Sequence, residues 1–210
     1  NRSLFRTKFI KRHGEFKYLE ELIRNIEDYQ INKYGETLYE HENSETKRNI
    51  NIYLDAKEKI EKMEDCRGKN HDLRLFRSWL NEYLPGHRNL SKIQVGGTNG
   101  KGSTCQWLAS LLENAGYKVG VFTSPHLISH MERIVVNHKS IEENEWEAIY
   151  DRYESLFSEK QMTMFEMDLW MALDYFLKQE VDVAIIEVGM GGRLDATTAL
   201  DYCATLITNV

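Results

Sequence analysis

The stretch from Ile93 to Thr104 constrains the fold of this chain more than any other feature of the sequence. An apolar run over 90–95 ends abruptly in glycines, and apolar residues at helical spacing, from Trp107 to Leu112, follow the glycines. This order predicts a strand, a glycine-rich loop and a helix. Glycines let the backbone adopt positive φ angles and approach a ligand closely, and the N–H groups at a helix N-terminus attract anions. The stretch therefore predicts an anion-binding loop.

The same loop carries side chains that suit a phosphate ligand. Lys101 supplies a mobile positive charge, and Ser103 or Thr104 supplies a hydroxyl that can reach Mg²⁺ or a phosphate. The common phosphate-binding pattern has Ser or Thr directly after the lysine, whereas Gly102 intervenes here. An ordinary glycine turn is the alternative, but the lysine, the hydroxyls and the strand–loop–helix order favour nucleotide binding.

Length and composition narrow the class of protein further. The 210 residues suffice for one core of ordinary size, or for one domain with an appendage. The net charge of −6 implies no general affinity for nucleic acid, and no apolar run approaches the ~20 residues of a membrane helix. Cys66, Cys105 and Cys203 show no metal-binding spacing, so we expect reduced thiols in a cytoplasmic protein.

The first third of the chain has a different character from the rest. A basic arm over 1–17 precedes two predicted amphipathic helices, 16–31 and 50–63, which carry no catalytic pattern. A third predicted helix, 73–83, leads into the remainder of the chain. We therefore predict an N-terminal arm and helical region over 1–70.

From residue 71 onward, strands and helices alternate. The predicted strands are 90–95, 117–122, 133–136, 181–188 and 204–208, and the predicted helices are 102–115, 141–158 and 165–178. Gly116 is expected to cap the first of these helices, and Ser140 and Glu143 are expected to form a capping box at the second. The alternation predicts a P-loop domain over 71–210 of the α/β class, with a mostly parallel sheet and flanking helices.

Three predicted strands end in polar or glycine-rich sequence, at 96–103, 123–126 and 187–195. Parallel sheets bind ligands at the carboxyl ends of their strands, so we expect these segments to converge on one site. Ser124 fits either an ordinary turn or a Mg²⁺ ligand. Glu187 ends a predicted central strand, where a buried carboxylate requires a partner. Mg²⁺ facing nucleotide phosphates is the favoured partner, and a salt bridge, for example with Arg193, is the alternative.

Several other polar residues have more than one interpretation. Asp195 and Arg193 lie on a glycine-rich loop and could bind substrate or only fix that loop. Phe165 and Glu166 stand at a predicted helix start, where Glu is favourable and could act as a cap. His126, His130 and His138 have no mutual spacing that demands a metal.

Taken together, these segments resemble the folylpolyglutamate synthase/dihydrofolate synthase family, a branch of the Mur ligase-like ATP-dependent amide-bond ligases. The matching segments are 97–103, 123–127, 132–134, 165–166 and 187–197, in matching order and spacing. The resemblance covers residues 73–210, and Gly102 is part of the family's own version of the loop. Leu169 and Thr198 stand where the family usually has Thr and Asn.

The resemblance implies a domain of the Mur ligase central type and a role for each matching segment. The implied ATP-binding residues are Gly97, Thr98, Asn99, Gly100, Lys101, Gly102, Ser103 and Thr104, with Lys101 as the catalytic residue that stabilises the transferring phosphoryl group. The implied Mg²⁺ ligands are Ser124 and Glu187. The implied pteroate-binding residues are Thr163, Met164, Phe165, Glu166, Leu194, Asp195 and Ala196.

The resemblance also implies a reaction: ATP-dependent ligation of L-glutamate to a folate or dihydropteroate carboxylate through an acyl phosphate. A Mur-like ligase with another acceptor and a nucleotide-binding module without ligase activity are the alternatives. In the family, a third metal ligand, a His, and a C-terminal domain follow the strand that ends the present sequence. We therefore expect a fragment that is inactive alone.

Overall fold

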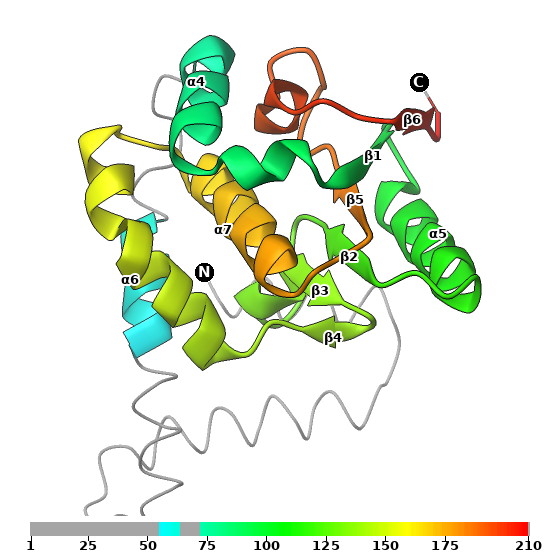
Figure 1. Cartoon of the computed structure of the whole chain (residues 1–210), viewed down its shortest axis with the longest axis horizontal. Coiled ribbons are helices and arrows are strands. Elements are labelled where there is room, and N and C mark those ends of the chain that lie inside the picture. The colour runs from blue at the N-terminus through cyan, green and yellow to red at the C-terminus, as the bar shows by residue number, and fades with distance from the viewer. Residues whose placement is uncertain (1–54, 64–71, 210) are drawn as a thin grey trace, which may run out of the picture. The chain divides into compact units, whose positions relative to one another are not determined.

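The computed structural model describes residues 55–63 and 72–209, and these form a six-stranded sheet with flanking helices (Figure 1). The strand order is β4-β3-β2-β5-β1-β6. The parallel strands are β1 (Ser91–Gly96), β2 (Val119–Phe122), β5 (Val183–Glu187) and β6 (Ala204–Ile207). Next to β2, β3 (Ile134–Val136) and β4 (Lys139–Ser140) continue the sheet in antiparallel fashion. The predicted α/β fold with a mostly parallel sheet is confirmed.

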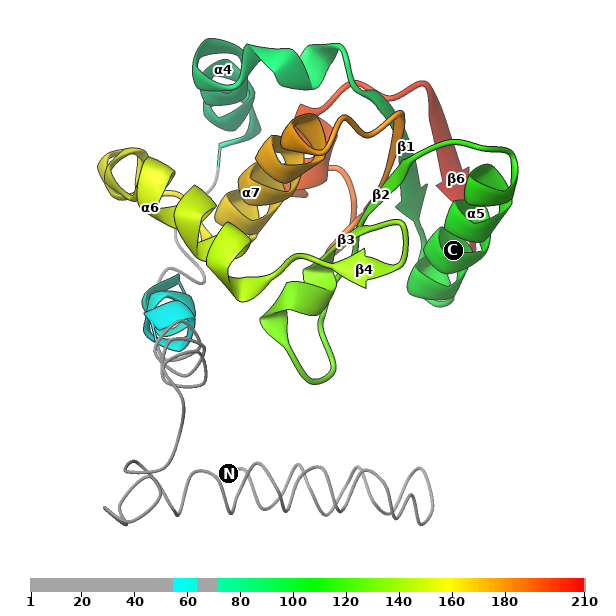
Figure 2. The ribbon, with the colours of Figure 1, turned by 60° about the horizontal axis from the view of Figure 1, so that its bottom comes forward.

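Helices cover both faces of this sheet (Figures 1 and 2). On one face lies α5 (Lys101–Asn114), whose Cys105 and Ala109 pack against Val95 and Ile185 in a small core cluster. The other face carries α4 (Leu73–Tyr83), α6 (Glu143–Glu159) and α7 (Met164–Lys178). Three short 3₁₀ turns complete the described elements: η1 (Pro85–Arg88), η2 (His130–Arg133) and η3 (Ala196–Ala199).

The central strand β5 is apolar at successive positions because both of its faces are covered. Ile185 belongs to the cluster under α5, whereas Ala184 and Ile186 belong to the larger cluster under α7. All three side chains are fully buried. Side chains alternate between the faces of a strand, so a strand between two helical layers needs apolar residues on both sides.

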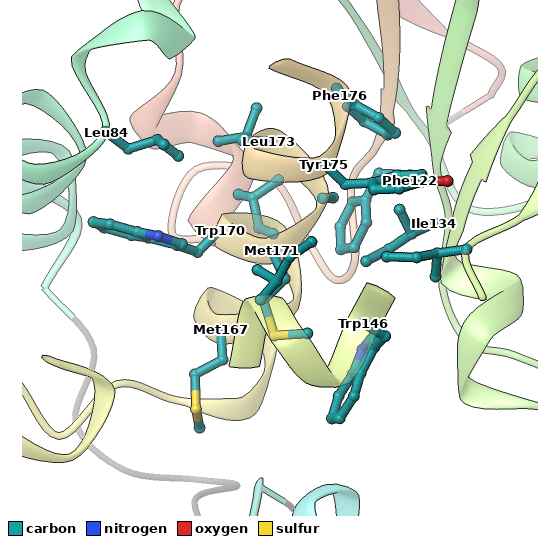
Figure 3. Close-up of a cluster of buried hydrophobic side chains, with 14 of the residues drawn as sticks. Leu84, Phe122, Ile134, Trp146, Met167, Trp170, Met171, Leu173, Tyr175 and Phe176 are labelled. Atoms are coloured by element: carbon teal, nitrogen blue, oxygen red, sulfur yellow. The ribbon is translucent and has the colours of Figure 1, made fainter. Parts of the chain in front are cut away.

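Helix α7 forms the centre of the larger cluster and is apolar around most of its circumference. Figure 3 shows Trp170, Met171 and Leu173 of α7 together with side chains from the elements around them, namely Leu84, Phe122, Ile134 and Trp146. A helix enclosed on several sides needs more than one apolar stripe. Its enclosed position fixes where its first turn, and therefore Phe165, lies relative to the sheet.

Residues 55–63 are helical and pack on α6. Lys59 Nζ forms ion pairs with Glu147 (2.9 Å) and Asp151 (2.7 Å), and Met63 is fully buried. The predicted helix over 16–31 and the basic arm lie outside the described residues. The predicted boundary at residue 70 stays a prediction, because 64–71 also lie outside them. No helix within 55–63 and 72–209 combines the length and apolarity that a bilayer crossing requires.

One predicted helix end is confirmed and one is wrong. After α5, Gly116 has φ +94° and its N–H donates to Glu113 O, while Tyr117 N–H donates to Leu112 O, the pairing of a Schellman cap. The predicted capping box at Ser140 is absent, because Ser140 instead pairs with Val135 in the β3–β4 hairpin. Helix α6 begins later, with Glu142 at its N-cap position and no side-chain cap. A two-residue strand is too short to show a period in the sequence.

Candidate active site

The carboxyl ends of β1, β2 and β5 are adjacent in the sheet, and the segments that follow them meet. Glu187, the last residue of β5, accepts a hydrogen bond on Oε2 from Ser124 N, at 3.2 Å, after β2. Its Oε1 lies 4.0 Å from Lys101 Nζ, at the start of α5. The predicted convergence of the three strand ends is confirmed, because Glu187 lies within 4.0 Å of both the Ser124 backbone nitrogen and the Lys101 ammonium group.

The glycine loop between β1 and α5 has the geometry of an anion-binding loop. Gly97 (φ +130°) and Gly100 (φ +79°) both adopt positive φ, and Gly100 is the N-cap of α5. No side chain caps α5, so its first-turn N–H groups remain available to a ligand at the positive end of the helix. The backbone of Gly102 lies close to Glu187, because a Cβ there would be 3.7 Å from Oε2.

The residues that follow β6 brace this loop, a feature that the sequence analysis missed. Asn209 Oδ1 accepts hydrogen bonds from Thr98 N (3.0 Å) and Asn99 N (2.9 Å). Thr208 Oγ1 donates to Asn99 O at 2.7 Å. The N–H groups of Thr98 and Asn99 therefore already have an acceptor. The first-turn amides of α5 are the better placed donors for an anion.

The hydroxyl and thiol groups of α5 differ in availability. Thr104 Oγ1 donates to Gly100 O at 2.8 Å, within the helix, whereas Ser103 is exposed. Burial, with a further contribution from Glu187, raises the pKa of the Cys105 thiol to about 12. Cys105 is thus a protonated, unreactive core residue.

Glu187 is a buried carboxylate with few partners. It is 5% exposed, and burial raises its pKa, while the Ser124 N–H and then Lys101 act in the opposite direction. Arg193 is exposed and, within the described residues, makes no ion pair with Glu187, so Arg193 is not the partner of this carboxylate; the ion pair that Glu187 forms is with Lys101. Within residues 55–63 and 72–209, no group of three or more His, Cys, Asp or Glu side chains could hold a metal ion. Glu187 and Ser124 supply two oxygen groups, the type that Mg²⁺ prefers.

The first turn of α7 is held by a capping box. Glu166 Oε2 accepts hydrogen bonds from Thr163 N (2.7 Å) and Thr163 Oγ1 (2.9 Å), and Thr163 Oγ1 accepts from Glu166 N (3.3 Å). Glu166 is 3% exposed and its carboxylate is part of this box, so its position agrees with the interpretation of Glu166 as a helix cap. Met164 is buried as well, whereas Phe165 is half-buried and its ring packs against that of Phe122 at 5.6 Å.

The loop after β5 is held by Asp195. Its Oδ2 accepts from Met190 N (2.9 Å), and its Oδ1 accepts from Thr197 N (3.0 Å) and Thr197 Oγ1 (2.6 Å). Asp195 therefore fixes the loop, as one of its two interpretations proposed. Leu194 beside it is 73% exposed, and Ala196 is buried.

Gly189 brings the two predicted substrate segments together. A Cβ on Gly189 would lie 2.7 Å from Phe165 Cζ and 3.0 Å from Asp195 Oδ2. Only a residue without a side chain fits between the first turn of α7 and the loop after β5. Among the predicted substrate residues of these segments, Leu194 is exposed and Thr163 and Phe165 are half-buried, whereas the others are buried.

Comparisons with known proteins agree with this geometry. A sequence profile of the Mur ligase middle domain matches residues 95–210. The dihydrofolate synthase/folylpolyglutamate synthase of Escherichia coli (strain K12) is 44% identical over 116 residues, 55% of this chain and 28% of that protein.

Solved structures give the same result. A Mycobacterium tuberculosis folylpolyglutamate synthase complexed with ADP has a TM-score of 0.67 and 32% identity, covering 76% of this chain and 37% of that one. A bifunctional folylpolyglutamate synthase/dihydrofolate synthase with Mn, AMPPNP and L-glutamate bound has a TM-score of 0.63 and 35% identity, covering 67% and 34%. The chain thus spans less than two fifths of the length of each relative. The profile match extends over more than half of this chain, which therefore belongs to the Mur ligase family, in its folylpolyglutamate synthase/dihydrofolate synthase branch.

Proposed function

We propose that this chain forms the phosphate-binding and metal-binding part of an ATP-dependent ligase that joins L-glutamate to a folate or dihydropteroate carboxylate. The observation that carries the proposal is the meeting of Lys101, Ser124 and Glu187 at three adjacent strand ends, beside the uncapped N-terminus of α5. The relatives named above support the reaction and the substrates, because their names describe this ligation and one of them binds AMPPNP, Mn and L-glutamate.

The residues of this chain fit Mg²⁺ as the metal. Burial raises the pKa of the Glu187 carboxylate, and the nearest cation is 4.0 Å away. A hard metal cation would therefore stabilise this buried carboxylate more than it would stabilise an exposed carboxylate. Ser124 and Glu187 would hold that ion. When bound, Mg²⁺ would neutralise charge on the nucleotide phosphates.

Lys101 and the first-turn amides of α5 would hold the transferring phosphoryl group and stabilise its developing charge. The substrate carboxylate would attack the γ-phosphorus of ATP, so that ADP leaves and an acyl phosphate forms. The amine of L-glutamate would then displace phosphate to give the amide. Neither step requires a protein nucleophile, and the chain's own task is to position the reactants and exclude water.

The folate-type substrate would lie by the first turn of α7 and the loop after β5, near Thr163–Glu166 and Leu194–Ala196. Phe165 and Leu194 are exposed enough to contact a ring. Glu166 and Asp195 would act by holding these two segments in place, since their carboxylates already accept backbone N–H groups. We also propose a cytoplasmic location, which the free thiols of Cys105 and Cys203 support.

The test is ADP release by the complete protein with MgATP, a folate or dihydropteroate, and L-glutamate. Release that requires both the pteroate-type substrate and glutamate would support the proposal. Release with a different acceptor amine would indicate another Mur-like ligase, and nucleotide binding without turnover would indicate a binding module.

A further inference from the structure

Asp168 of α7 is a fully buried carboxylate at the centre of a polar cluster that the reaction above does not use. Its Oδ2 accepts from Arg133 Nη1 at 2.8 Å, and its Oδ1 pairs with His130 Nε2 at 2.7 Å. Arg133 and His130 are 7% and 4% exposed, so the cluster has little contact with water. Removing one partner from such a cluster leaves buried polar groups unpaired, which is costly.

His126 connects this cluster to Ser124, one of the two candidate metal ligands. Arg133 Nε donates to His126 Nδ1 at 3.0 Å, and His126 lies two residues after Ser124. The backbone adds a second connection, because Thr123 N donates to Arg133 O at 3.0 Å. Arg133 therefore holds both the start of the 123–133 loop, where Ser124 lies, and the carboxylate of Asp168.

The 123–133 loop is itself a fixed unit. Glu132 accepts backbone N–H groups from Leu127 (2.9 Å), Ile128 (2.9 Å) and Ser129 (2.7 Å). Ser129 and Glu132 also form a capping box at η2. Because the loop is internally fixed, its attachment to α7 through Asp168 sets the position of the whole loop, Ser124 included.

We propose that Asp168 is a positioning residue that fixes Ser124 for metal binding and joins the metal-bearing loop to the helix that begins with Phe165. The inference rests on the proposed function, because it assumes that Ser124 and Glu187 hold Mg²⁺. Asp168 touches neither metal nor substrate; it acts through Arg133 and His126. It thereby links the two halves of the site, since Phe165 lies one helical turn before it on α7.

The experiment compares Asp168→Asn with Asp174→Asn in the complete protein. Asp174 lies on the same helix, is 7% exposed, and accepts hydrogen bonds from Arg152 (3.0 Å) and Tyr153 (2.8 Å) of α6, away from the Ser124 loop. Both variants lose a buried charge, so both are expected to melt at a lower temperature. Mn²⁺ affinity, measured by electron paramagnetic resonance with AMPPNP present, should fall about tenfold in Asp168→Asn and stay unchanged in Asp174→Asn.

Arg133→Lys provides a second variant should Asp168→Asn fail to fold. A lysine has one nitrogen and cannot reach Asp168 and His126 together, as the guanidinium does. The same loss of Mn²⁺ affinity is expected, and the Mg²⁺ concentration for half-maximal turnover should rise in parallel.

Wild-type Mn²⁺ affinity in folded Asp168→Asn or Arg133→Lys would overturn the inference and leave Asp168 with a role in stability alone. Wild-type protein that binds no Mn²⁺ with AMPPNP present would instead overturn the proposed metal site, and the inference with it. These two failures are therefore distinguishable.

Discussion

Asn209 Oδ1 accepts a hydrogen bond from Asn99 N at 2.9 Å, although the two residues are 110 positions apart in the chain. The contact exists because β6 pairs with β1 in parallel, with Gly96 opposite Ile207, so the residues after both strands leave the sheet at the same edge. The shape of the glycine loop is thus set partly by residues outside the loop sequence.

The first prediction tests this brace by substitution of Gly97. A Cβ there would collide with Thr208 Oγ1 and lie 3.0 Å from Asn209 O, at a φ of +130°. Gly97→Ala should therefore lose about 3 kcal/mol or more of unfolding free energy, from backbone strain and overpacking together. Gly191→Ala is the matched control, since Gly191 also has positive φ (+76°) but no atom near a Cβ. It should lose about 1–2 kcal/mol. Equal losses in urea unfolding would contradict the brace.

The second prediction concerns Lys101. Lys101→Ala removes the positive side chain beside the α5 N-terminus and leaves Glu187 with the Ser124 N–H. Charge-assisted contacts contribute about 1.5–3 kcal/mol in binding and more in a transition state, so turnover should fall at least about 10²-fold. The melting temperature should stay near that of the wild type. Lys139→Ala, at an exposed site on β4, is the control and should retain activity. Near-normal turnover in Lys101→Ala would refute the phosphate role.

The third prediction separates a metal role for Glu187 from a purely structural one. Glu187→Gln keeps an acceptor for Ser124 N but removes the charge. If Glu187 holds Mg²⁺, the Mg²⁺ concentration for half-maximal activity should rise about tenfold or more. Thermal stability should change little or rise, because burial disfavours the carboxylate. A lower melting temperature with an unchanged Mg²⁺ titration would indicate a structural ion pair instead.

The fourth prediction is a pH dependence of stability that arises from His87. This imidazole is 2% exposed, its Nε2 pairs with Asn81 Oδ1 at 3.2 Å, and its Nδ1 has no partner among the described residues. Burial, reinforced by Lys92 and Arg88, lowers its pKa from 6.5 to about 4. Above pH 6.5, His87 is neutral in both the folded and the unfolded protein, so its titration does not change the free energy of unfolding. Between pH 6.5 and 4 the unfolded state takes up a proton that the folded state does not, so stability falls as pH falls.

The maximum loss is about 3 kcal/mol, from 1.36 kcal/mol for each pH unit of the shift. Urea unfolding at pH 7 and pH 4.5 measures it. In His87→Gln, which cannot titrate but can still donate to Asn81, the difference between the two pH values should shrink by most of that amount. Identical pH dependences in the two proteins would show that His87 takes up its proton at the same pH in the folded and unfolded states, and would contradict the lowered pKa.

Much of the fold could be predicted because its signals are local. The continuous apolar run of β5, the period of α7 and the glycines after β1 each report the environment of their own segment. Glu187 was identifiable for the same reason, since a carboxylate that ends a buried strand is conspicuous. The substrate roles of Phe165 and Leu194 came from the family resemblance and stay predictions.

The features that escaped prediction depend on pairing between distant segments. Asn209 reaches the glycine loop only because β6 neighbours β1, and no local pattern marks it. Asp168 did leave a signal, because a carboxylate interrupts the apolar helix over 165–178, but its partner Arg133 lies 35 residues earlier. Ser140 was misassigned because a capping-box pattern and a two-residue strand occupy the same positions.

The strand order β2-β5-β1 also determines when the site can form during synthesis. As the chain leaves the ribosome, β1 and β2 emerge first, yet they have no shared hydrogen-bonded neighbour until β5 has emerged and inserted between them. Until then, Lys101 and Ser124 lie on two segments that nothing in the sheet holds together. The nascent domain therefore exposes unpaired strand edges while about 60 residues after β2 are translated, a few seconds or more at ~5–20 residues per second.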